Sequence, residues 1–158
     1  MKKIPAKKKA ILVFAIAAFA AAVYNLLWFA NYRAYDKYIG NGYEVSSASS
    51  TNYSRQSDEA TFHVKKPGYL GFVGNLAVAN EDQSVILLIW PSFMCDSIND
   101  YGLMLYDNEQ DRGFMVNVNS EMAYDAENRT GLSPNDEAAA RKLLETLHDA
   151  VLEQLSRA

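Results

Sequence analysis

The longest apolar run in the sequence lies near its N-terminus. Segment 10–30 holds 21 residues, none of them charged. With a rise of about 1.5 Å per residue, a helix of this length spans about 31 Å, which matches the thickness of a bilayer core. Soluble helices are seldom apolar on every face over such a length. The pattern therefore predicts a single transmembrane helix over 10–30.

Aromatic residues gather toward the far end of this segment, as amphipathic rings do at a headgroup boundary: they are Tyr24, Trp28, Tyr32, Tyr35 and Tyr38. Gly40-Asn41-Gly42 then offers a helix stop, so the helix can extend to about residue 39. Segment 40–59 is rich in Ser, Thr and Asn and poor in large aliphatic residues. It is predicted to be a polar linker or a loosely held edge segment.

From residue 60 onward the pattern changes to a period of two, which is typical of half-buried strands. Apolar and polar residues alternate in 60–65, 103–106 and 114–118, and Leu70, Phe72, Leu76 and Val78 fall on one face of another strand. Segment 85–90 is apolar throughout, which predicts a central strand covered on both faces. Because the links are short and hold no helix, these segments predict an antiparallel meander of four to five strands.

The C-terminal segment returns to helical spacing. Ser133 is suited to be the N-cap and Pro134 to be the first helical residue. An apolar stripe then follows at helical spacing: Ala140, Leu144, Leu147, Val151 and Leu155, widened by Leu143 and Leu152. An amphipathic helix of this kind is expected to cover the apolar face of the sheet, so the fold class is α+β.

Charge places the parts relative to a membrane. All five charges in the first 30 residues are lysines, whereas the rest of the chain carries a net charge of −9, which together give −4. The positive-inside rule then predicts a basic cytoplasmic tail at 1–9 and an extracytoplasmic α+β domain at 60–158. So acidic a domain disfavours nucleic acid as a partner.

A cleaved signal peptide is the alternative to a retained anchor. Ala18-Phe19-Ala20 and Ala20-Ala21-Ala22 both resemble cleavage sites, and cleavage would release a secreted binding domain. However, the chain stays apolar from Val23 to Ala30, which would leave an awkward mature N-terminus in water. The pattern favours the retained anchor.

Catalytic candidates are few. Cys95 is the only cysteine, so no intramolecular disulfide can form. Together with His63 and Asp96 or Asp100, it supplies the residue types of a thiol nucleophile, a base and an orienting acid. No local signature supports this grouping, and a membrane-tethered thiol-type hydrolase using Cys95 and His63 is therefore only the alternative function.

No metal site or cofactor is predicted. His63 and His148 are the only histidines, which nearly excludes a histidine-based metal site. The acidic segment 107–111 is similar to the start of a calcium loop, but Arg112 stands where that loop needs its turn glycine. A polar hairpin tip explains this segment better.

The most unusual segment runs from Trp90 to Asp96 and places two aromatic residues, a methionine and the thiol after the most apolar strand. Trp90, Phe93 and Met94 are candidates for binding a peptide or a protein partner, although packing over one end of the core is the favoured interpretation. The sequence thus predicts a single-pass membrane-anchored protein with a small acidic interaction or accessory domain. Its expected partners are the lipid bilayer and a protein of the cell envelope.

Overall fold

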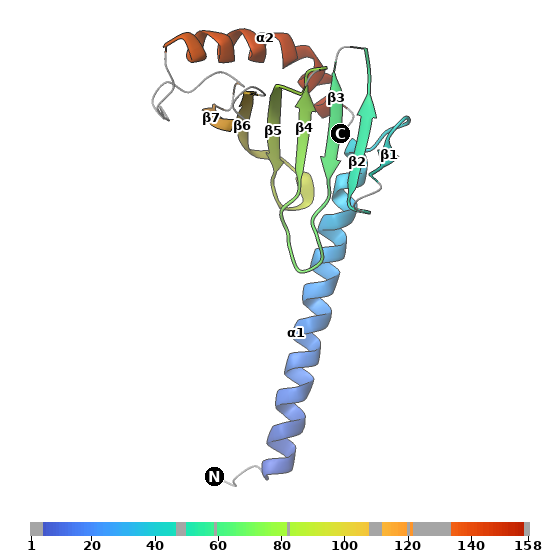
Figure 1. Ribbon diagram of the computed structural model, residues 1–158. Coiled ribbons are helices and arrows are strands. Elements are labelled where there is room, and N and C mark those ends of the chain that lie inside the picture. Colours follow the sequence, from blue (N-terminus) through green and yellow to red (C-terminus); the bar gives the residue numbers. More distant parts are fainter. Residues whose placement is uncertain are drawn as a thin grey trace.

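The computed structural model describes residues 5–46, 50–58, 60–81, 83–107, 112–119, 121 and 134–156. The fold is α+β, with a long N-terminal helix, a seven-stranded antiparallel sheet and a C-terminal helix (Figure 1). In chain order, the elements are α1 (Ala6–Ala34), η1 (Tyr35–Tyr38), β1 (Glu44–Val45), β2 (Asn52–Gln56), β3 (Thr61–Lys65), β4 (Asn75–Ala79), β5 (Val85–Pro91), η2 (Phe93–Cys95), β6 (Ile98–Asp107), β7 (Arg112–Val118) and α2 (Pro134–Ser156).

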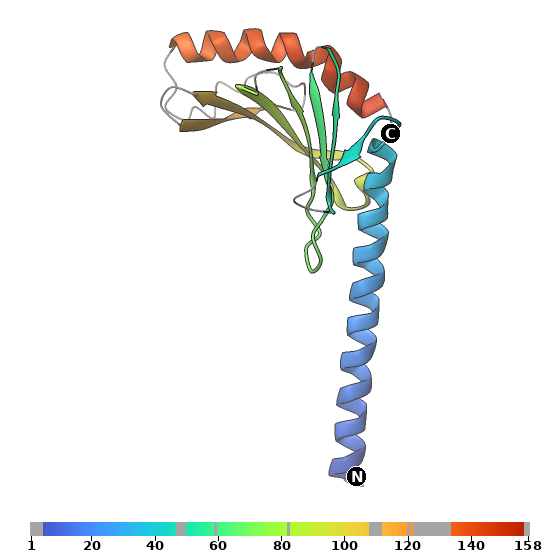
Figure 2. The same cartoon turned by 45° about the vertical axis from the view of Figure 1, so that its right-hand side comes forward.

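The N-terminal helix is continuous and projects away from the sheet. α1 passes directly into the 3-10 helix η1, and in both overall views its N-terminal part stands clear of the domain (Figures 1 and 2). By length and composition, this helix is able to cross a membrane. The C-terminal end of this helix is not fully exposed, because Asn31, Tyr35 and Tyr38 are buried against the domain.

The predicted meander is confirmed, with more strands than expected. All strands are antiparallel to their neighbours and follow chain order across the sheet. The two additional strands, β1 and β2, lie in segment 40–59, which was predicted to be a polar linker. β2 pairs with β3 along its whole length although it carries few aliphatic residues. This part of the sheet is held by backbone hydrogen bonds, which cannot be predicted from the pattern of hydrophobic residues.

Two details of the strand prediction were wrong. The strand predicted to run from Leu70 to Val78 begins only at Asn75, because Leu70 and Phe72 lie in the loop between β3 and β4. β5 is covered on one face only. Its residues alternate between buried Val85, Leu87 and Ile89 and the partly exposed Ile86, Leu88 and Trp90.

One face of the sheet, the inner face, forms the core. Facing residues align across the strands, since Phe62 lies opposite Val78 and Val78 lies opposite Leu87. The members of this core with less than 3% exposure include Phe62, Val64, Leu76, Val78, Leu87, Ile89, Leu103 and Val116. Tyr35, Tyr38 and Cys95 belong to the same cluster.

α2 covers the inner face, as the sequence predicted. Leu144, Leu147 and Val151 are buried in the core cluster, and the helix contacts β4, β5 and β6. It crosses the end of the sheet that lies farthest from the N-terminus (Figures 1 and 2). The predicted N-cap Ser133 and the acidic hairpin residues 108–111 lie outside the described residues.

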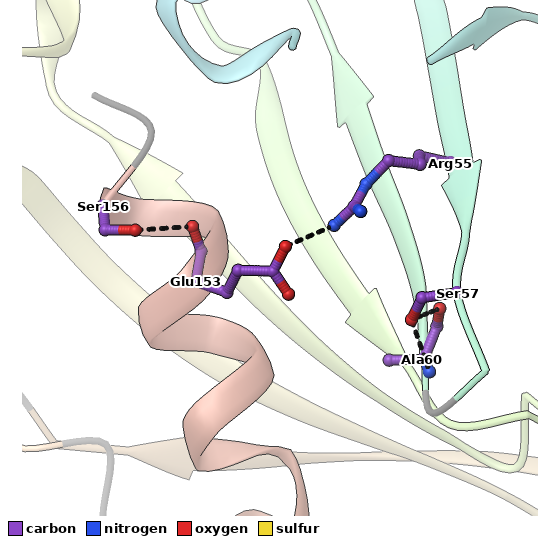
Figure 3. A network of polar contacts seen from close by, with 5 residues as sticks. All are labelled: Arg55, Ser57, Ala60, Glu153 and Ser156. Carbon is purple, nitrogen blue, oxygen red and sulfur yellow. Dashed lines mark hydrogen bonds and ion pairs between the residues drawn. The ribbon is translucent and has the colours of Figure 1, made fainter. Parts of the chain in front are cut away.

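Polar contacts fix the C-terminal end of α2 to β2 and β3. The Arg55 guanidinium donates to Glu153 Oε1 over 2.8 Å (Figure 3). The Cζ atom of the same guanidinium lies 4.2 Å from the centre of the Phe62 ring. Gln154, which is fully buried, donates from Nε2 to the backbone carbonyl of His63 over 3.1 Å. These contacts hold α2 in place beyond its apolar stripe.

Candidate interaction site

The sheet separates the thiol from the imidazole. Cys95 is only 1% exposed and lies in the core on the inner face. His63 stands between Phe62 and Val64 on β3, and since side chains alternate along a strand, its imidazole lies on the opposite, outer face. Burial raises the pKa of the Cys95 thiol to about 11, so very little thiolate is present near neutral pH. Burial also lowers the pKa of His63.

The Asp96 side chain forms its hydrogen bond within its own turn. Its carboxylate accepts a hydrogen bond from the Ser92 hydroxyl, and this bond lowers the pKa of Asp96. The backbone N–H of Ser92 donates to the carbonyl of Ser97 over 2.9 Å and closes the same turn. The geometry therefore provides no grouping of Cys95, His63 and Asp96. Within the described ranges, no three His, Cys, Asp or Glu side chains gather at a metal-binding distance either.

The predicted binding residues lie on two different surfaces. Trp90 lies on the outer face of the sheet, where Gly102 leaves room for its ring: a Cβ added there would stand 2.9 Å from the indole and 3.1 Å from Met115 Sδ. Phe93 and Met94 belong to η2 and lie near α1. The Phe93 ring is 5.8 Å from that of Phe72, and the Met94 N–H donates to Asn31 Oδ1 over 2.7 Å.

A row of hydrogen bonds joins α1 to the loop at 66–74, which we call the β3–β4 loop. Tyr24 OH donates to the carbonyl of Leu70 over 2.7 Å, and Trp28 Nε1 donates to that of Gly68 over 2.9 Å. Asn31 Nδ2 donates to the carbonyl of Phe72 over 2.8 Å. Finally, the Gly74 N–H donates to Tyr35 OH over 3.0 Å. We refer to these four helix residues and the loop as the clasp.

Aromatic rings pack alongside these hydrogen bonds. The Tyr24 ring meets the Phe72 ring edge-on at 5.1 Å, and the Trp28 ring meets the Tyr69 ring in the same way at 5.1 Å. Tyr69 OH also donates to Asn25 Oδ1 over 3.0 Å. The loop therefore contacts α1 through both its backbone and its side chains.

An ion cluster closes the upper end of the clasp. Lys66 is only 4% exposed and forms an ion pair with Asp36, whose second carboxylate oxygen lies 2.9 Å from Arg33 Nε. The Lys66 ammonium also lies 4.5 Å from the centre of the Tyr32 ring. Beside it, Lys37 Nζ donates to the backbone carbonyl of Cys95 over 2.6 Å. Helix and sheet are thus joined by ion pairs as well as by hydrogen bonds.

Sequence reasoning missed the clasp, although a signal for it is present. Tyr24, Trp28, Asn31 and Tyr35 follow the spacing i, i+4, i+7, i+11, which places them on one face of a helix. All four carry a hydrogen-bonding group on a large or polar side chain. The aromatic members alone predict a headgroup belt, whereas the helical periodicity of the whole set indicates a face that contacts protein.

Two shallow hollows lie on the outer side of β2 and β3. One, of about 290 Å³, is lined by polar groups that include Ser54, His63, Lys65 and Asn75. The other, of about 490 Å³, shares Ser54 and His63 and adds Arg55 and Glu81. Such linings can hydrogen-bond a polar ligand.

Comparison of the chain with protein-family models, with curated proteins and with solved structures finds no match. The case for a function therefore rests on the geometry of the chain itself. Three features enter it: the exposed apolar half of α1, the clasp, and the apolar part of the outer face over β5, β6 and β7.

Proposed function

We propose that this chain is a single-pass membrane-anchored protein whose acidic α+β domain stands at the extracytoplasmic surface as an interaction or accessory module. The observation that carries the proposal is the division of one uninterrupted helix into two environments. Large apolar side chains such as Phe14 and Phe19 are more than 70% exposed, whereas Asn31 and Tyr35 in the same helix are at most 1% exposed. An apolar surface of that extent suits lipid and not water.

The clasp supports a retained anchor. Cleavage near Ala20 or Ala22 would leave Leu26, Leu27 and Phe29 exposed at the start of a soluble domain. It would also place Tyr24, which donates to the β3–β4 loop, within a few residues of a frayed terminus. In the intact chain, Tyr24, Trp28 and Asn31 of the helix all donate hydrogen bonds to the loop.

The outer face of the sheet is the surface that we assign to a protein partner. Ile86, Leu88, Trp90 and Met104 are only partly buried there, and Met115 is 42% exposed. Tryptophan and methionine are enriched at protein interfaces because they offer a large contact area and, for methionine, an adaptable shape. Because the clasp joins the sheet to α1 through several hydrogen bonds, we expect this face to be presented in one orientation to a neighbouring protein in the membrane.

Protease accessibility tests the anchor and its direction. Cells with any wall removed would be treated with protease, with one epitope tag at each end of the chain. We expect loss of the C-terminal tag and protection of the N-terminal tag. Protection of the C-terminal tag in sealed cells would overturn the orientation. A mature protein that begins near Ala21 or Val23 would overturn the retained anchor.

Site-specific photo-crosslinking tests the assigned surface. A photoreactive residue at Met115 should form adducts with a protein in native membranes, because this side chain is exposed on the outer face. The matched control is Glu145, which is exposed on α2 on the other side of the molecule. Equal labelling from both positions would argue against a partner on the outer face.

A further inference from the structure

We propose that the tip of the β3–β4 loop inserts into the same bilayer that α1 crosses, in the half next to the domain. The partner of this surface is lipid, and the residues that contact it are Tyr69, Leu70 and Val73. This inference rests on the proposed anchor but goes beyond it, since a protein can be anchored by a helix without any of its loops entering the membrane.

The hydrogen bonds of the clasp set the depth of the loop. Leu70, at the tip, is bonded to Tyr24, which lies six residues before the end of the uncharged segment at Ala30. Six residues of helix correspond to about 9 Å along the axis. When segment 10–30 fills the hydrocarbon core, the tip is therefore below the outer boundary of that core. Figures 1 and 2 both show the loop between β3 and β4 reaching past the sheet alongside α1.

The side chains of the loop suit that depth. Residues 67–74 carry no charge. Tyr69, Leu70 and Val73 are 64%, 65% and 73% exposed, so much of the apolar surface of the loop is not covered by protein. A tip made only for water would favour polar turn residues such as Asn, Asp or Ser.

Part of the loop backbone is hydrogen-bonded by protein groups. Irregular backbone is tolerated at membrane depth where protein groups satisfy its hydrogen bonds. The carbonyls of Gly68, Leu70 and Phe72 each accept a hydrogen bond from a side chain of α1. The Gly71 N–H donates to the carbonyl of Gly68 over 2.9 Å and closes the tip turn.

Leucine occupies an unusual position in this turn. Leu70 has a φ of 70°, in the left-handed region that glycine and asparagine adopt at lower cost. Glycine stands beside it at Gly68 and Gly71, so small residues are available in the segment. An apolar side chain at the outermost position of the tip, held there against its backbone preference, is accounted for by a contact with lipid.

Charge marks the same boundary on the helix and on the loop. Going up from the membrane, the first charged residue on the helix is Arg33, followed by Asp36, and the first on the loop side is Lys66. Asp36 forms ion pairs with both Arg33 and Lys66. The uncharged parts of the two segments therefore lie side by side below a common charged layer.

A depth measurement tests the insertion. Leu70→Cys would be introduced into the full-length chain, labelled with an environment-sensitive fluorophore and reconstituted in phosphatidylcholine vesicles. Cys95 should not compete for the label, because it is buried and its pKa is raised. We expect blue-shifted emission that nitroxide-labelled acyl chains quench several-fold more strongly than aqueous iodide does. Val73→Cys, at the most exposed loop position, serves as the second reporter should the first variant fold poorly.

Two control positions separate this inference from the proposed function. Glu81→Cys labels the exposed turn between β4 and β5 and should report water. Ala17→Cys labels the middle of the apolar segment and should report lipid. If position 17 reports lipid but positions 70 and 73 behave like position 81, the loop does not insert and only this inference fails. If position 17 also reports water, the anchor itself is wrong.

Discussion

The two helices attach to the same domain by different balances of apolar and polar contacts. α2 uses an apolar stripe, with Leu144, Leu147 and Val151 buried against the inner face of the sheet. α1 uses a hydrogen-bonding stripe, in which Tyr24, Trp28 and Asn31 donate to carbonyls of the β3–β4 loop. The exposed residues of α2 are mostly charged or polar, whereas those of α1 up to Phe29 are mostly apolar.

The difference follows from the medium that each helix is proposed to face. In water, the removal of apolar surface drives a helix onto a sheet. Within a bilayer, lipid tails are as apolar as leucine, so apolar contact gives little preference for a protein neighbour over lipid. Hydrogen bonds and close packing then provide the specificity. Each helix thus carries the kind of stripe that its proposed medium favours.

The largest effect is expected at the apolar stripe. Leu147→Ala removes a buried side chain from the core under α2, and such truncations cost about 2–5 kcal/mol of the free energy of unfolding. The melting temperature of the full-length chain in detergent should fall markedly. Glu145→Ala, at an exposed position of α2, is the control and should change little. Unchanged stability of the leucine variant would mean that α2 does not hold the core.

The next effect is expected at the hydrogen-bonding stripe. Asn31→Leu leaves the carbonyl of Phe72 and the N–H of Met94 without their partner, and an unsatisfied buried group costs about 1–3 kcal/mol. The variant should unfold earlier in detergent although leucine is more apolar than asparagine. Phe29→Leu, at an exposed position of the same helix, is the control. A stabilised Asn31→Leu variant would show that α1 docks by apolar contact, and the contrast between the helices would be lost.

A smaller effect is expected where α2 meets β2. The Arg55 side chain is 16% exposed and that of Glu153 is 47% exposed, so solvent screens the pair. A double-mutant cycle of Arg55→Met and Glu153→Gln should give a coupling energy of about 0.2–1 kcal/mol in thermal or chemical unfolding. A coupling of several kcal/mol would mean that charge holds α2 as firmly as its leucines do.

The smallest effect is expected from His63. Burial lowers the pKa of this imidazole in the folded chain, so the unfolded chain binds its proton first as the pH falls. His63 should therefore contribute nothing to the pH dependence above about pH 7 and should lower the free energy of unfolding as the pH falls below about 6.5. His63→Gln should flatten the curve of melting temperature in that range. Identical curves for the variant and the unchanged protein would contradict a lowered pKa of His63 in the folded chain.

Hydrophobic periodicity was sufficient to predict the main elements of the fold. The α+β class, the meander and the α2 stripe all follow from alternation or helical spacing of large apolar residues such as Phe62, Leu103 and Leu147. β2 was missed because Asn52–Gln56 is held by its backbone pairing with β3 and carries little apolar surface. β5 was taken to be covered on both faces because Ile86, Leu88 and Trp90 are apolar, yet these side chains form the partly exposed outer face.

The candidate site was less accessible to sequence reasoning. The sequence prediction grouped Trp90, Phe93 and Met94 because they are neighbours in the chain. However, β5 ends at Pro91, so Trp90 lies on the sheet whereas Phe93 and Met94 lie in η2 on a different surface. Cys95 and His63 were grouped by residue type, which carries no information on the face of the sheet that each occupies. The clasp depends on a loop that returns to the helix some 40 residues later, as the separation between Trp28 and Gly68 shows. Single-sequence periodicity does not encode such a return.

The strictly sequential order of the strands affects how the chain can be assembled during synthesis. Every strand pairs with the strand made just before it, so the sheet can grow from β1 toward β7 as the polypeptide emerges. The apolar cover, in contrast, is made after the whole sheet, because α2 (Pro134–Ser156) follows β7 in the chain. Until α2 has been synthesised, it does not cover the inner face of the sheet. The apolar inner face is therefore expected to be open to aggregation and to chaperones in the interval between the synthesis of β7 and that of α2.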